Sequence, residues 1–212
     1  MKKLIYSAVA AVVIAATQAA MANVVTLTFE GLQDGEQILN YYNGGFGGSG
    51  SGPGPNYGIT FGGDSLALIS YAAGGGGNFT GSPTMPTIAF FLSGAGDVMD
   101  VPAGFDTGFS FYYADQVGFT GSVTVYSGLD GAGSVLASLS LPSTPDPYNV
   151  WVPVGVSFAG TAQSVIFSGA ADYIGFDDIT LGSQTPGTGP DGGATALLLG
   201  ASLLGLAGLR RK

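Results

Sequence analysis

The chain has 212 residues and a formal net charge of −9, and its five basic residues all lie at the two ends. Residues 4–209 contain no Lys, Arg or His, and so purely anionic a surface argues against a nucleic-acid partner. The chain has no cysteine, which excludes disulfides, thiol catalysis and zinc sites made of Cys and His. The length suits one ordinary domain with export signals.

The first 22 residues have the three parts of a secretory signal peptide. Lys2 and Lys3 form the charged start, residues 4–16 form the apolar helix, and an Ala-Met-Ala sequence ends at Ala22. We predict that the secretion machinery engages this segment and that signal peptidase cuts between Ala22 and Asn23. The alternative is an uncleaved anchor, although the apolar stretch is shorter than the ~20 residues that span a membrane.

Residues 23–182 alternate short apolar or aromatic runs with Gly, Pro, Asn and Asp, which is typical of strands separated by turns. Phe109, Phe111 and Tyr113 would share one face of a strand, and the Gly-rich residues 128–133 indicate a hairpin. Nine or ten short strands predict an antiparallel β-sandwich with jelly-roll topology. The predicted strands are 24–29, 59–61, 66–70, 87–92, 108–113, 122–126, 135–141, 150–158, 164–167 and 173–181.

Two Gly-rich segments, 43–58 and 74–77, are predicted to be loops. The longer one also contains Phe46 and Tyr57. It is either a tolerated surface insert or a cover over one face of the sandwich that shapes a binding site, and the sequence favours the first alternative.

The end of the chain reads as a polar linker, an apolar helix and a basic stop. Residues 183–189 are rich in Gly, Pro, Ser and Thr, and residues 194–209 are uncharged and mostly apolar. A helix of that length spans about 24 Å, slightly less than a hydrocarbon core of roughly 30 Å. Arg210, Arg211 and Lys212 follow, and positive charge beside an apolar run favours the cytoplasmic face. A plain anchor and a processed sorting tail are both possible.

Residues 190–212 resemble a PEP-CTERM sorting signal of the VPDSG-CTERM variant, although Gly189 stands where Val is usual and Gly192 where Ser is usual. The motif comprises Pro190, Asp191, Gly192 and Gly193. The resemblance implies recognition by an exosortase, a membrane cysteine enzyme of Gram-negative bacteria that make exopolysaccharide. It also implies an inner-membrane intermediate, cleavage near the Pro-Asp motif, and delivery to the cell surface or extracellular matrix.

Acidic residues stand near both ends of the predicted sandwich, in Thr-Phe-Glu-Gly-Leu at 28–32 and Ile-Gly-Phe-Asp-Asp-Ile-Thr-Leu at 174–181. This arrangement is similar to MAM-like and carbohydrate-binding jelly-roll modules, in which the first and last strands are neighbours. The resemblance implies that Glu30, Asp177 and Asp178 hold a structural calcium ion, which accepts six to eight oxygen ligands. Alternatively, the two aspartates alternate across the strand and both meet water.

The chain lacks the residues that most classes of enzyme need for catalysis. No His is available for a Ser-His-Asp triad, and no nucleotide-binding Gly motif stands between a strand and a helix. A carboxylate pair of the glycosidase kind is the remaining possibility, with Glu30 or Glu36 as a member. We therefore expect no enzymatic activity.

We predict an exported, non-enzymatic cell-surface or extracellular-matrix protein associated with exopolysaccharide. It could act through abundance and solubility, or as a carbohydrate-binding module that stacks aromatic side chains on sugar rings. The set at residues 41–43 is expected to be the most exposed, because it borders the Gly-rich loop. The candidate aromatic residues are Tyr41, Tyr42, Tyr112, Tyr148 and Trp151.

Overall fold

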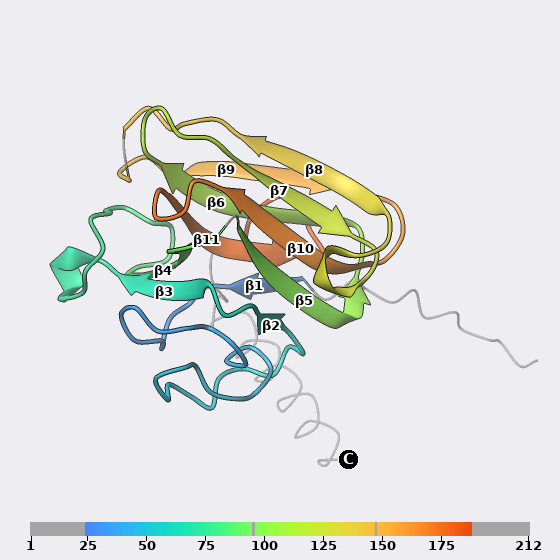
Figure 1. The fold of residues 1–212 in the computed structure, drawn as a ribbon, viewed down its shortest axis with the longest axis horizontal. Coiled ribbons are helices and arrows are strands. Elements are labelled where there is room, and N and C mark those ends of the chain that lie inside the picture. Colours follow the sequence, from blue (N-terminus) through green and yellow to red (C-terminus); the bar gives the residue numbers. More distant parts are fainter. Residues whose placement is uncertain (1–23, 95, 147, 188–212) are drawn as a thin grey trace, which may run out of the picture.

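The computed structural model describes residues 24–94, 96–146 and 148–187, which form a sandwich of two antiparallel sheets (Figure 1). The first sheet has the order β3–β4–β11–β6–β9, and β1 also pairs with β11. Its strands are β1 (Val25–Leu27), β3 (Ser65–Ile69), β4 (Thr87–Phe91), β6 (Gly108–Asp115), β9 (Val152–Ser157) and β11 (Ile174–Leu181). The second sheet has the order β2–β5–β10–β7–β8. Its strands are β2 (Thr60–Phe61), β5 (Gly96–Phe105), β7 (Gly121–Tyr126), β8 (Val135–Leu141) and β10 (Ala162–Gly169).

The predicted all-β sandwich is thus confirmed. Two short 3₁₀ turns, η1 (Tyr71–Ala73) and η2 (Leu129–Gly131), complete the described elements. No helix in these described ranges is long and apolar enough to cross a membrane. The predicted signal helix, the signal-cleavage residues, the sorting motif, the apolar helix and the basic stop lie outside the described residues.

The connections follow the jelly-roll pattern. From β4 onward, successive strands alternate between the two sheets, except for the predicted hairpin of β7 and β8. The first and last strands are neighbours, with Val25 opposite Leu181, as the sequence predicted. This pairing places the start of the domain beside its last strand, in the middle of the first sheet.

The core between the sheets is largely aromatic. Phe109 and Phe111 are fully buried on one face of β6, and Tyr113 follows them on the same face. Phe111 packs against Phe167 of β10 and Phe176 of β11, with ring centroids 6.1 and 5.6 Å apart. Each such buried ring removes 150–250 Å² from water. A chain without disulfides thus obtains its stability from core burial.

Beyond β11, residues 183–187 turn back over the outer face of the first sheet. The Ser110 hydroxyl, which points away from the core, donates to the Ser183 carbonyl at 2.9 Å. The Gly187 amide donates to the Thr180 hydroxyl at 3.0 Å. Gly155 permits this approach, because a Cβ there would lie 2.0 Å from the Gln184 carbonyl oxygen. The start of the predicted linker is therefore fixed against the sandwich.

Candidate functional site

β11 changes neighbours in the middle of the strand, and two acidic residues lie at this point. Its first residues pair with β4 and its last with β1. Between them its register with β6 shifts between Asp177 and Thr180, and Asp178 has a φ of 48°. This β-bulge faces the loop after β1, which carries Glu30, and the start of β4 at Thr87. The fold thus brings the three predicted calcium ligands to one region.

Three backbone amides and the Thr84 hydroxyl hold the three carboxylates. The Thr84 amide donates to Asp177 Oδ2 at 2.9 Å, and the Thr84 hydroxyl donates to Asp178 Oδ1 at 2.7 Å. The Thr87 amide donates to Glu30 Oε1 at 2.9 Å. The Asp178 amide donates to Asp177 Oδ1 at 2.8 Å. These hydrogen bonds therefore hold the segment before β4 against the bulge in β11.

Both aspartates are completely buried, so the alternative in which they meet water is wrong. Burial, together with the nearby charges of Asp178 and Glu30, raises the pKa of Asp177 to about 9. Burial also raises the pKa of Glu30 and of Asp178. Asp178 Oδ2 is buried without a hydrogen-bond partner. A bound proton or cation would therefore stabilise this group of buried carboxylates.

The carboxylates do not, however, form a ready metal site. In the described part of the chain, no three acidic side chains are arranged so that they could hold one metal ion. Most of their oxygens already accept hydrogen bonds from Thr84, Thr87 and the Asp178 amide. The orphaned Asp178 Oδ2 is the oxygen that is free to begin coordination.

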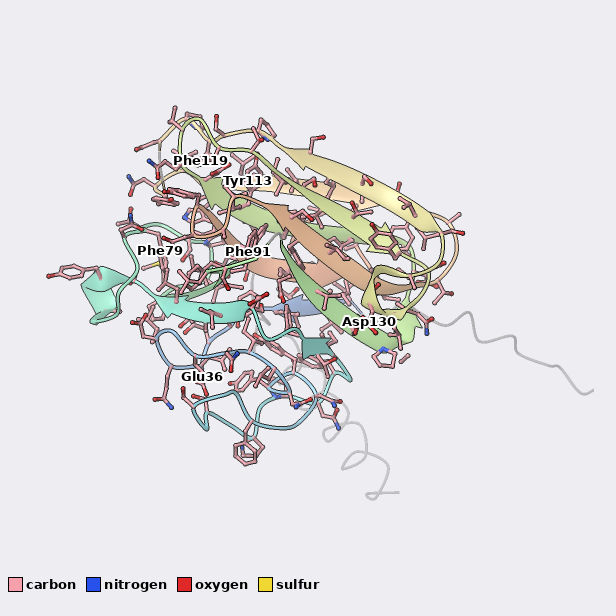
Figure 2. All side chains as sticks on the ribbon, in the orientation of Figure 1. Glu36, Phe79, Phe91, Tyr113, Phe119 and Asp130 are labelled. Carbon is pink, nitrogen blue, oxygen red and sulfur yellow. The ribbon has the colours of Figure 1, made fainter. Side chains whose placement is uncertain are left out.

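The Gly-rich segment 43–58 is organised by one buried carboxylate, Glu36, which is only 1% exposed. Glu36 Oε1 accepts hydrogen bonds from the amides of Ser49 at 2.8 Å and Ser51 at 3.0 Å. Its Oε2 accepts from the Gln33 amide at 2.8 Å. Figure 2 shows Glu36 among the loops below the sheets. The segment is therefore a defined structure, which favours the alternative in which it shapes a site.

A groove of about 530 Å³ runs beside this loop, and we call it the Tyr57 groove. It lies where the loop meets β1 and the end of β5 and has aromatic and polar lining. Tyr57 is 41% exposed and stacks on the buried Tyr42, with ring centroids 6.2 Å apart and planes 13° apart. The other lining residues with functional side chains are Asn56, Phe105, Asp106 and Thr161.

The expectation for residues 41–43 is wrong, because Tyr41 and Tyr42 are only 8% and 3% exposed. The Tyr41 hydroxyl donates to the Glu30 carbonyl at 2.9 Å, and the Tyr42 hydroxyl accepts from the Phe29 amide at 2.6 Å. Tyr57 lies one loop further on, in the segment that the sequence marked as a possible cover of a binding site.

Three other predicted aromatics lie away from this groove. Tyr112 is half-buried and faces outward on the first sheet. Trp151 donates its indole N–H to the Thr80 carbonyl at 3.0 Å and packs edge-on against Phe79. Tyr148 is half-buried, and burial with the charges of nearby acids raises its pKa to about 12. Trp151 thus has a structural partner that occupies its polar atom.

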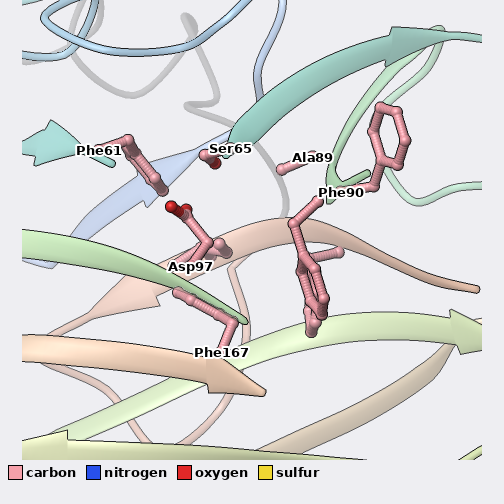
Figure 3. Close-up of a pocket in the computed structure, with 9 residues that line it drawn as sticks. Phe61, Ser65, Ala89, Phe90, Asp97 and Phe167 are labelled. Carbon is pink, nitrogen blue, oxygen red and sulfur yellow. The ribbon is translucent and has the colours of Figure 1, made fainter. Parts of the chain in front are cut away.

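Two further acidic side chains are buried in the sandwich. Asp97 points between the sheets beside Phe61 and Ser65 (Figure 3) and is 8% exposed. Burial raises its pKa to about 7. Asp115 follows Tyr113 on the inward face of β6, and burial raises its pKa to about 6. Neither residue was singled out by the sequence, because Asp97 lies in β5, which was not predicted, and Asp115 lies beyond the predicted strand 108–113.

Comparison with known protein families identifies a motif at the end of the chain. The family model for the VPDSG-CTERM motif matches residues 190–212. This chain ends in a PEP-CTERM-like sorting signal. The motif indicates export toward the cell surface and implies processing by an exosortase. Among curated proteins, no sequence matches the chain.

Several solved structures resemble the sandwich, all at low similarity. One is a family 43 arabinoxylan arabinofuranohydrolase from Bacillus subtilis in complex with cellotetraose, 19% identical over 57% of this chain and 25% of that chain, with a TM-score of 0.38. Another is CsCBM6-3 from Clostridium stercorarium in complex with cellobiose, 14% identical over 58% of this chain and 86% of that chain, with a TM-score of 0.38. A carbohydrate-binding module of Cellvibrio mixtus lichenase 5A in complex with cellotriose is 19% identical over 57% and 87%, with a TM-score of 0.33.

Proposed function

We propose that this chain is a non-enzymatic protein of the cell surface or extracellular matrix that associates with exopolysaccharide. The single observation that carries the proposal is the sorting motif at residues 190–212, which follows a compact sandwich with no basic side chain. An inner-membrane intermediate, held by the tail until an exosortase acts, precedes delivery. The matrix-associated form is then a polyanion.

The positions of the two glutamates support a non-enzymatic role. Glu36 is buried and accepts three backbone N–H groups, so it has no open access to a substrate. Glu30 is held by Thr87 at the β11 bulge. A glycosidase needs two carboxyl groups that flank one sugar linkage in an open site. Neither glutamate lines the Tyr57 groove.

The test is to follow the exported chain in a producing cell with and without its exosortase. We expect the mature protein to sediment with the isolated exopolysaccharide when the enzyme is present. Without the enzyme, a membrane-held form with the tail should accumulate. A mature form that stays entirely in the soluble fraction, whatever polysaccharide is added, would refute the association. Sugar release that Glu30→Gln abolishes would refute the non-enzymatic role.

We also propose that a calcium ion is bound at the β11 bulge. Asp178 Oδ2 would begin the coordination, and Glu30 and Asp177 would contribute further oxygens only after their side chains move, because the three carboxylates do not surround one ion in this structure. The proposal is supported by the buried, unpartnered oxygen and by the lack of any basic side chain in residues 4–209. Calcium bound only to the folded state would raise the thermal midpoint by mass action. A midpoint that is the same in calcium and in chelator would remove the proposal and favour a proton there.

A further inference from the structure

We propose that the Tyr57 groove binds a short stretch of an uncharged polysaccharide, with the Tyr57 ring as its stacking platform. This inference rests on the proposed association with exopolysaccharide and assigns it to one place on the molecule. The groove volume of about 530 Å³ lies within the range of ligand sites, roughly 300–1,000 Å³.

The platform is already held in position. Tyr57 stacks nearly parallel on Tyr42, and the Tyr42 hydroxyl is fixed by the Phe29 amide at 2.6 Å. The Tyr57 amide donates to the Tyr42 carbonyl at 2.8 Å, which fixes the backbone below the ring. A rigid aromatic side chain with an exposed face loses little conformational entropy when a ligand stacks on it.

The groove also offers polar atoms of the kind that bind sugar hydroxyls. Asn56 and Thr161 each provide donors and acceptors, and Asp106 provides acceptors. All three are exposed at the edge of the groove. Phe105 adds a second aromatic surface among the lining residues. A lining that mixes aromatic and aliphatic side chains with a few polar groups suits a ring whose faces are C–H and whose edge carries hydroxyls.

Charge decides which polysaccharides can bind. Residues 4–209 contain no basic side chain, and Asp106 adds a negative charge to the groove itself. A chain of uronic acids or sulfated sugars would meet repulsion and would find no cationic partner. The groove should therefore prefer neutral hexose chains over acidic ones.

The experiment is calorimetric titration of the full chain in a detergent that has no sugar head group. The probes are cellotetraose, laminaritetraose, isomaltotetraose and mannotetraose as neutral chains, and tetragalacturonate as an acidic chain. We expect at least one neutral probe to bind and tetragalacturonate not to bind. Tyr57→Ala should weaken the binding at least tenfold, and Tyr57→Phe, which keeps the ring, should stay within threefold of the parent.

The matched control is Tyr71→Ala, because Tyr71 is 80% exposed in η1 and does not line the groove. This variant should bind as the parent does. Equal binding by Tyr57→Ala and the parent would overturn the groove and leave polysaccharide association standing. Preference for tetragalacturonate would also overturn it. A parent that binds no probe but sediments with isolated exopolysaccharide defeats the groove alone, whereas a parent that does neither defeats both proposals.

Discussion

Glu36→Gln should destabilise the protein by removing the carboxylate that organises the Gly-rich loop. The substitution keeps the size of the side chain but replaces one acceptor oxygen with an NH₂ group. Glu36 Oε1 accepts two backbone N–H groups and Oε2 accepts a third. In either amide orientation, at least one buried N–H then faces another donor.

The expected cost is about 2–4 kcal/mol. A hydrogen bond to a charged group contributes roughly 1.5–3 kcal/mol and a neutral one roughly 0.5–1.5, while an unmatched buried donor costs about 1–3. The loop cannot easily move to relieve the mismatch, because a Cβ on Gly47 would already lie 2.5 Å from Glu36 Oε1. Out of a total of roughly 5–15 kcal/mol, this loss is large.

Urea unfolding followed by circular dichroism measures the free energy. Burial alone would raise the pKa of Glu36, but the hydrogen bonds from Ser51, Gln33 and Ser49 outweigh it and lower the pKa. The contribution of the carboxylate is therefore present above its unfolded pKa and is lost as the pH falls through the folded value. Asp146→Asn is the control, since it removes the same charge at an exposed residue. A Glu36→Gln variant within 0.5 kcal/mol of the parent at neutral pH would refute the reasoning; the margin is roughly that of ordinary surface substitutions.

Three other perturbations test the same structure. Because burial raises the pKa of Asp97 from 3.8 to about 7, the free energy of unfolding should fall as the pH rises from about 4 to 7. Asp97→Asn should remove up to roughly 4 kcal/mol of that fall, as measured by urea unfolding. A decline of equal size in the variant would contradict this assignment. Gly155→Ala should release residues 183–187 from the sheet, which hydrogen exchange at the Gly187 amide would detect as lost protection. Added NaCl should raise the thermal midpoint, because thirteen of the 14 acidic residues precede Asp191 and salt screens their repulsion; a lower midpoint in salt would show that repulsion does not limit stability.

The sequence predicted most of the sandwich because its strands are short, apolar and separated by Gly. The alternation of Phe109, Phe111 and Tyr113 marked the core face of β6 correctly. β5 was missed, although it is the longest strand among the described residues. Pro102 and Gly104 interrupt the alternation of apolar residues in this strand. The buried Asp97 and the half-buried Asp100 interrupt it further. Pairing with β10 overrides these weak local preferences.

The candidate site was predicted less well, because its residues are defined by distant contacts. The proximity of Glu30 to the β11 bulge follows from the pairing of the first and last strands, which the sequence could indicate. The exposure of Tyr57 and the burial of Tyr42 depend on the path of a Gly-rich loop. Glycine lets that path take many forms. The contacts that select one of them, such as the Ser49 and Ser51 amides on Glu36 and the Tyr57 amide on the Tyr42 carbonyl, appear only in the folded chain.

A chain without basic side chains cannot form ion pairs between residues 4 and 209, so its acids bind backbone N–H groups instead. Asp34 joins two distant segments by accepting from the amides of Ile69 at 2.8 Å and Gly76 at 2.9 Å. Glu36 does the same for the Gly-rich loop. At Glu36 these charge-assisted bonds lower the pKa and favour the ionised form, whereas burial of Asp97 raises its pKa and favours the proton. Replacing a carboxylate by its amide should therefore destabilise the fold at Asp34 and Glu36, and relieve it at Asp97 above pH 7.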